Sequence, residues 1–254
     1  MRTVRTGMVI GRISQVALLA MLAGTVGLGV LGWLVGIACG LTTNAALARG
    51  LTRSGACALG PANRITLARA TLVGGVAALV ADMYVRPAPV TPLVALAVVA
   101  LALDAVDGWI ARRTRTVSAL GARFDMEVDA FLILVLSTYV ARSVGPWVLA
   151  IGAARYAYVA VGWLRPWLRE AVPARYWRKT VAAIQGIVLT VAAAHVLPGP
   201  EIDAALTVAL VLLAESFGRD VWWLRRRSRV DTRASVERRR ILVPARSPSR
   251  AAAG

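Results

Sequence analysis

The sequence has little charge and few of the side chains that carry chemistry in soluble enzymes. Only 17% of its 254 residues are charged, whereas 58% are hydrophobic, and the mean hydropathy is +0.65. Because a soluble globular protein needs a more polar surface than this, the composition excludes a soluble enzyme. The single histidine, His195, and the two cysteines, Cys39 and Cys57, supply neither a spaced metal cluster nor a disulfide framework.

Acidic residues are also scarce, with 13 Asp and Glu against 30 Lys and Arg, so the formal net charge is +17. A basic excess of this size can indicate nucleic-acid binding, but here the arginines stand between apolar runs. We therefore expect contact with membrane lipids of the inner leaflet and no nucleic-acid partner.

Apolar runs fill most of the chain, and a membrane-spanning helix needs about 20 such residues. Proline and glycine-proline sequences separate the runs. The sequence therefore predicts an all-α integral membrane protein with seven hydrophobic segments, at about 16–41, 66–84, 92–111, 120–141, 147–164, 180–197 and 203–224.

The distribution of arginine orients the last six segments, because positive residues favour the cytoplasmic side of a membrane. Basic residues are concentrated in alternate connections and from Arg219 onward, while the other connections contain only Arg86 and Arg142. These six spans are therefore expected to begin and end in the cytoplasm. The short, arginine-rich chain is typical of a protein of the bacterial cytoplasmic membrane.

The first segment, at 16–41, does not fit this pattern. Arginines before it and after it favour the same side, and one crossing cannot satisfy both. A seventh helix or a glycine-rich re-entrant segment is favoured over a cleaved signal peptide, because the apolar stretch is longer than usual for a signal peptide. We expect an N-terminal extension at 1–59, a membrane domain at 60–226 and an arginine-rich, disordered cytoplasmic tail at 227–254.

Four aspartates in two neighbouring spans are the main chemical feature. Asp104 and Asp107 are three residues apart, and Asp125 and Asp129 are four apart, so each pair shares one face of a helix. A short loop joins the two helices, which places both pairs at one depth near the cytoplasmic side. Contact with nearby arginines at the interface would explain one such residue but not four. One or two Mg²⁺ or Mn²⁺ ions would relieve the repulsion, whereas Glu127 points to another side.

The residues around these aspartates resemble a family signature. The CDP-alcohol phosphotransferase family has this pattern: Asp104-Ala-Val-Asp107-Gly108-Trp-Ile-Ala111-Arg112, eight residues, Gly121, three residues, Asp125, three residues and Asp129. In addition, Pro61-Ala-Asn63-Arg-Ile-Thr66-Leu-Ala-Arg69 is similar to the start of that family's first core helix. The resemblance covers about residues 60–226 and implies a six-helix transmembrane core, to which the N-terminal hydrophobic segment is an addition.

The resemblance also implies an activity, cofactors and a site. Such enzymes move a phosphoryl-linked group from a CDP-linked lipid donor or other CDP-activated donor to an alcohol, release CMP and commonly form homodimers. It implies two Mg²⁺ or Mn²⁺ ions, with Asp104, Asp107, Asp125 and Asp129 as metal ligands and Asp129 also as the general base. The residues that it assigns to nucleotide binding are Gly108, Ala111, Arg112, Gly121, Asn63, Thr66 and Arg69. Arg112 is also explained as a cytoplasmic anchor, and Asn63 and Thr66 as helix-start residues.

The acceptor alcohol is less clear. Arg155 lies mid-span, and Arg175, Arg178 and Lys179 lie in a cytoplasmic connection, where they could bind a phosphorylated polyol such as glycerol phosphate or inositol phosphate. The three connection residues are better explained as topology determinants, so Arg155 is the stronger candidate. We expect CDP-diacylglycerol as the donor and a small polar alcohol as the acceptor.

Three alternatives remain open at this point. The first is a transferase that uses CDP-choline or CDP-ethanolamine with a diacylglycerol acceptor. The second is a cation-coupled transporter, although the sequence shows neither the repeats nor the broken helices expected of one. The third is a scaffold without activity.

Overall fold

The computed structural model describes residues 2–54, 61–87, 89–114, 119–169 and 176–242. Within these ranges the chain forms eight α-helices and two short 3-10 helices and has no strand, which confirms the predicted all-α fold. The elements are α1 (Arg2–Val26), α2 (Val30–Ser54), α3 (Pro61–Asp82), α4 (Val90–Thr114), α5 (Ala119–Val140), η1 (Pro146–Val148), α6 (Leu149–Leu164), η2 (Pro166–Arg169), α7 (Tyr176–Ala194) and α8 (Gly199–Leu242).

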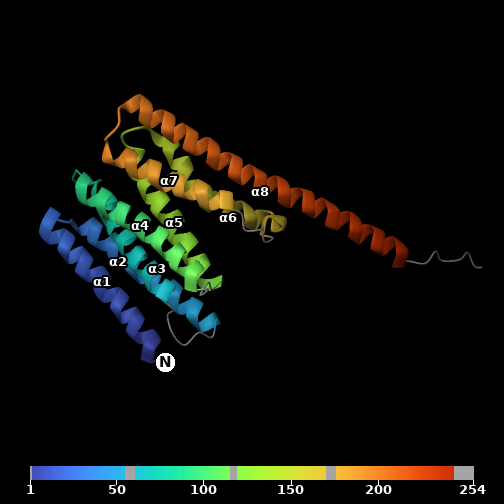
Figure 1. The fold of residues 1–254 in the computed structure, drawn as a ribbon, viewed down its shortest axis with the longest axis horizontal. Coiled ribbons are helices and arrows are strands. Elements are labelled where there is room, and N and C mark those ends of the chain that lie inside the picture. The colour runs from blue at the N-terminus through green and yellow to red at the C-terminus, as the bar shows by residue number, and fades with distance from the viewer. Residues whose placement is uncertain (1, 55–60, 88, 115–118, 170–175, 243–254) are drawn as a thin grey trace, which may run out of the picture.

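The helices run side by side as a bundle, with α1 and α2 on one side and α6, α7 and α8 on the other (Figure 1). Helix α3 packs against α1, α2, α4 and α5, and α5 in turn packs against α6 and α7. The buried core lies along these contacts and includes Val76 and Leu79 of α3, Leu136 of α5 and Leu189 of α7. The arrangement places α3 between the N-terminal helices and the helices that carry the aspartates.

Within the described ranges, four helical segments are long and apolar enough to cross a membrane by length and composition: Val9–Val26, Val30–Gly50, Ile65–Asp82 and Pro146–Leu164. Val90–Val106 forms a shorter apolar stretch. Helix α5 is as long as these spans but carries Arg123, Asp125, Glu127 and Asp129 in its first half. Two of the four charges that make α5 a poor span by composition, Asp125 and Asp129, are therefore those of the predicted site.

The N-terminal region differs from the prediction. The apolar run at 16–41 is divided between α1 and α2, which form a hairpin joined at Gly27–Gly29, where Gly27 has a φ of 73°. This positive φ favours glycine and allows the sharp turn. A single helix therefore does not describe this region. Both arginine-rich ends of a hairpin lie at the same end of it, so this arrangement is compatible with the charge pattern on both sides of the run.

The turn of the hairpin is fixed to the end of α3. The Gly29 backbone N–H donates to Oδ2 of Asp82 at 2.9 Å, and Nε of Arg86 lies 3.1 Å from the same oxygen. Arg86 also donates to the carbonyl of Gly27. A Cβ atom on Gly29 would lie 2.4 Å from Oδ1 of Asp82, so glycine is required for this close approach. These contacts attach the extension to the core.

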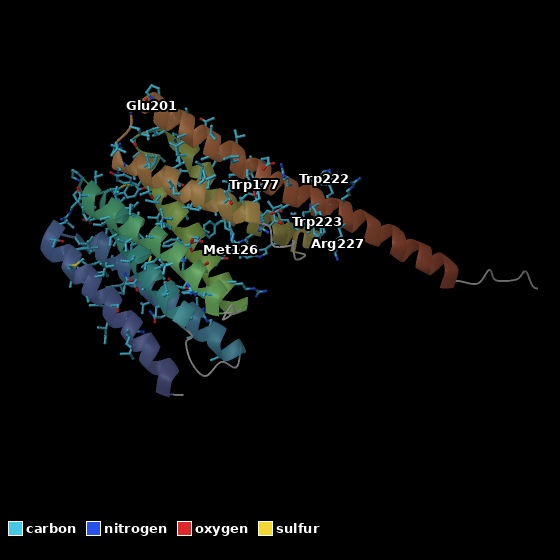
Figure 2. The ribbon with its side chains drawn as sticks, in the orientation of Figure 1. Met126, Trp177, Glu201, Trp222, Trp223 and Arg227 are labelled. Carbon is cyan, nitrogen blue, oxygen red and sulfur yellow. The ribbon has the colours of Figure 1, made fainter. Side chains whose placement is uncertain are left out.

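Helix α8 is longer than expected. It continues beyond residue 226, where we placed the start of a disordered tail, and ends at Leu242. Arginine and alanine favour helix, and extending an existing helix needs no new nucleus. Trp222, Trp223 and Arg227 lie where α8 leaves the bundle (Figure 2). Residues 243–254 of the predicted tail fall outside the described ranges.

Candidate active site

Three of the four predicted aspartates come together at one end of the bundle. Asp104 lies in the second half of α4, while Asp125 and Asp129 lie in the first half of α5, on either side of Met126 (labelled in Figure 2). Ligand oxygens of the three carboxylates lie within 4.8 Å of one another. Their side chains are 38%, 36% and 30% exposed, so the cluster is open on one side.

The structure describes the other predicted site residues only in part. The side chains of Asp107, Ala111, Arg112 and Asn63, and the whole of Arg175, lie outside the described residues. Gly108 is half-buried in α4 and Gly121 is half-buried in α5, on the two helices that carry the aspartates. Thr66 is buried in α3, one turn before Arg69. The nucleotide-binding role of all these residues stays a prediction.

Arg69 lies on the buried side of the aspartate cluster, and its residue exposure is 0%. Its NH1 group is 2.8 Å from Oδ1 of Asp104 and also contacts Oδ1 of Asp125, while NH2 contacts Oδ1 of Asp129. Its Nε donates to the carbonyl of Ala100 on α4 at 3.2 Å. Sequence analysis named Arg69 for nucleotide binding and missed these contacts, because they depend on α3 packing against both α4 and α5.

The charges of this group do not balance. Three carboxylates face one guanidinium, so the four side chains have an excess of negative charge when all are ionised. A negative excess beside membrane-spanning helices is costly unless cations or water compensate it. The donor set consists of carboxylate oxygens, which suit Mg²⁺ or Mn²⁺. The residues therefore fit a divalent cation.

Glu127 and Arg155 form a second charged pair, between α5 and α6. Glu127, which we did not expect among the ligands, contacts NH2 of Arg155 across the α5–α6 interface. The Nε of Arg155 is buried and has no hydrogen-bond partner among the described residues. Arg155 thus has one unpaired donor and one contact with the α5 segment that carries Asp125 and Asp129.

The other predicted acceptor residues lie on α7. Nε of Arg178 is 3.2 Å from Oδ2 of Asp220, which is 3% exposed on α8, and Lys179 is exposed. Sequence analysis missed Asp220, whose isolated acidic charge near the end of the last apolar run was the available signal. The pair ties α7 to α8, so Arg178 already has a structural partner.

A cavity of about 750 Å³ lies between α6, η2 and α8. Its walls are mostly apolar and include Val161, Leu213 and Phe217, with Arg165 and Arg225 among the lining residues. None of the clustered aspartates lines it. The cavity is therefore separate from the charged site.

Comparison with known proteins assigns the core of the chain to one family. The family model described as CDP-alcohol phosphatidyltransferase matches residues 60–217, which are more than half of the chain and include Arg69 and the aspartates. Searches of curated proteins and of solved structures gave no match. Enzymes of this family join a CDP-linked donor to an alcohol acceptor in membranes and generally depend on a divalent metal. With its apolar helices, the protein is an integral membrane transferase of substituted phosphate groups, and it belongs to the CDP-alcohol phosphatidyltransferase family.

Proposed function

We propose that the protein is a phospholipid-synthesis enzyme that transfers a phosphatidyl group from CDP-diacylglycerol to a small polar alcohol and releases CMP. The observation that carries the proposal is the cluster of Asp104, Asp125 and Asp129 at the meeting point of α3, α4 and α5. A diphosphate donor needs a concentration of positive charge, and this cluster is the place in the described structure best suited to collect divalent cations.

The aspartates would hold the cofactor and move the proton. Asp104, Asp107 and Asp125 are the proposed ligands of two Mg²⁺ or Mn²⁺ ions, which when bound would neutralise the diphosphate and its leaving group. Asp129 is the proposed general base: its carboxylate accepts the proton of the acceptor hydroxyl as that oxygen attacks the phosphorus atom. The bond from this phosphorus to the CMP oxygen then breaks, so the phosphatidyl group passes to the alcohol.

The nucleotide would lie against the surface between α4 and α5. Gly108 and Gly121 lie on these two helices close to the aspartates, and the absence of a side chain would let the cytidine nucleotide approach the backbone. Arg112 would supply a forked cation for the diphosphate oxygens. Ala111, Asn63 and Thr66 complete the proposed nucleotide-binding set.

Arg155 is the best-supported residue for binding an anionic acceptor. It lies on α6, faces the α5 segment that carries the aspartates, and keeps a buried, unpaired Nε donor. A phosphorylated polyol such as glycerol phosphate or inositol phosphate would supply the oxygen that this donor lacks. Arg175, Arg178 and Lys179 are weaker candidates, since Arg178 is already paired with Asp220.

The aspartate end is proposed to face the cytoplasm of a bacterium. The support is the charge pattern, because the connections at this end contain most of the arginines whereas the opposite end has Arg86 and Arg142. The homodimer implied by the family resemblance stays a prediction, which the mass of the purified protein in detergent would test.

CMP release by detergent-purified protein tests the proposal. The protein is given CDP-diacylglycerol with glycerol phosphate, inositol phosphate, inositol or serine in turn, with Mn²⁺, Mg²⁺ or EDTA. We expect metal-dependent release with one of these acceptors. Release only with CDP-choline or CDP-ethanolamine and diacylglycerol would overturn the donor assignment, and no release from folded protein with either donor class would overturn the activity.

A further inference from the structure

Arg69 differs from the other arginines of the described structure in its burial and in the number of its acidic partners. Its side chain is 1% exposed, whereas those of Arg86, Arg155 and Arg178 in the other interhelical or turn contacts are 44%, 24% and 36% exposed. It contacts three carboxylates, and each of those other arginines is paired with one. Burying a positive charge this deeply costs free energy unless specific partners compensate it.

The position of Arg69 reduces the repulsion among the three aspartates. Three carboxylates with ligand oxygens within 4.8 Å of one another repel strongly in a medium of low dielectric constant. The planar guanidinium reaches all three at once, which a lysine ammonium would do less well because it has no fixed fork. The Nε hydrogen bond to Ala100 holds the guanidinium in place from the α4 side.

A divalent cation would draw on the same negative charge. Asp104, Asp125 and Asp129 are at once the partners of Arg69 and the group whose geometry fits a metal ion. A fixed positive charge in contact with the ligands disfavours a second positive charge among them. Arg69 and the metal therefore oppose each other, whether or not the guanidinium moves when the metal binds.

We propose that Arg69 is an internal counter-ion of the aspartate cluster, which stabilises the protein before metal loading and lowers the affinity of the site for divalent cations. This inference rests on the proposed metal-dependent function. Its consequence is that the chain can fold in the membrane without metal and that metal exchange is readily reversible. Arg69 acts through the aspartates, so it is a positioning residue rather than a catalytic one.

Titration with Mn²⁺ in the absence of substrate, followed by the EPR signal of the free ion, tests the proposal on the full-length protein. Arg69→Met should bind Mn²⁺ about tenfold more tightly than the wild type, because the opposing charge is gone. Arg69→Lys, which keeps the charge, should stay within about threefold of the wild type. The matched control is Arg142→Met at the opposite end, where the guanidinium donates to the Met83 carbonyl, and its affinity should be unchanged.

Unfolding temperature gives a second readout that needs no activity. In EDTA, Arg69→Met should unfold at a lower temperature than both the wild type and Arg142→Met, and Mn²⁺ should raise its unfolding temperature more than that of the wild type. Should Arg69→Met fail to fold, Arg69→Met/Asp125→Asn restores the net charge that the cluster has in the wild type. Its Mn²⁺ affinity is then compared with that of Asp125→Asn alone, and the same tightening is expected.

The first kind of failure is a wild type that binds Mn²⁺ and releases CMP, with charge-removing variants that bind Mn²⁺ equally or more weakly. This result would overturn the counter-ion proposal but not the proposed transferase activity. A wild type that neither binds Mn²⁺ nor releases CMP would instead overturn the proposed function, and the inference with it. The two failures are therefore distinguishable in the same preparations.

Discussion

Both ends of the bundle place aspartate beside arginine, but in different proportions. At the hairpin end, Asp82 is buried and its Oδ2 atom is matched by Arg86 and the Gly29 N–H, so the charges balance, although its Oδ1 atom has no hydrogen-bond partner among the described residues. At the other end, one buried arginine faces three partly exposed carboxylates. A balanced pair is sufficient to hold helices together, whereas an excess of carboxylates open to the outside is suited to binding cations. The comparison separates a structural contact from a chemical site.

The largest expected effect is the loss of catalysis on neutralising the proposed base. Asp129→Asn should lower CMP release about 10²–10⁴-fold, because the amide cannot accept the hydroxyl proton. Its unfolding temperature should not fall, since the change also removes repulsion within the cluster. Asp203→Asn, an exposed aspartate near the start of α8, is the matched control and should keep full activity. Comparable activity in Asp129→Asn and the control would remove Asp129 from the mechanism.

Removing Asp82 at the hairpin end should instead lower the stability of the protein and leave its activity unchanged. Asp82→Ala removes the acceptor of both Gly29 and Arg86 and is expected to cost about 1–3 kcal/mol of stability. CMP release per folded molecule should change little, because Asp82 is at the far end of α3 from Arg69. Denaturation in detergent together with activity of the folded fraction checks both parts. A large loss of activity without loss of stability would contradict the division between the two ends.

A smaller loss of stability is expected when a side chain is added at the hairpin turn, where Gly29 lies close to Asp82. Gly29→Ala would place a Cβ atom 2.4 Å from Oδ1 of Asp82 and should destabilise the protein by about 1–2 kcal/mol. Gly24→Ala, in α1, has nothing within 4 Å of its new Cβ and should be neutral or slightly stabilising. Equal unfolding temperatures for the two variants would show that the turn does not pack against Asp82.

The smallest predicted effect concerns the acceptor. Arg155→Ala should raise the KM for an anionic acceptor about tenfold while changing the KM for the CDP-linked donor much less, because it removes one charged hydrogen bond. Arg142→Ala provides an arginine control outside the site. A rise in acceptor KM of no more than about twofold would remove Arg155 from acceptor binding.

Much of the fold was predictable because proline and glycine separate the apolar runs. The predicted spans from residue 66 onward correspond to α3 to α8, with ends that differ by a few residues except at the C-terminal end of α8, which continues to Leu242. The break between α1 and α2 was missed because Gly27, Leu28 and Gly29 produce no dip in hydropathy. The symmetric arginines on both sides of that run contained the signal, since a single crossing cannot satisfy them.

Helix periodicity predicted which aspartates share a face, but not their contacts with other helices. Spacings of three and four residues place aspartates on one face of a helix, and a short connection places two helices side by side. The partners of Arg69 depend on which face of α3 meets α4 and α5, and no local pattern specifies that. The same limit applies to Asp82 and Gly29, which are far apart in sequence and meet only through packing of the hairpin.

The most direct test of the central claim is to measure Mn²⁺ occupancy and CMP release in one titration of the wild type and Asp104→Asn. The account predicts that CMP release by the wild type rises with bound Mn²⁺ and disappears in EDTA, and that Asp104→Asn loses both binding and release. Full CMP release in EDTA, or Mn²⁺ binding that is unchanged by Asp104→Asn, would show that the excess of carboxylates at this end is not the catalytic metal site.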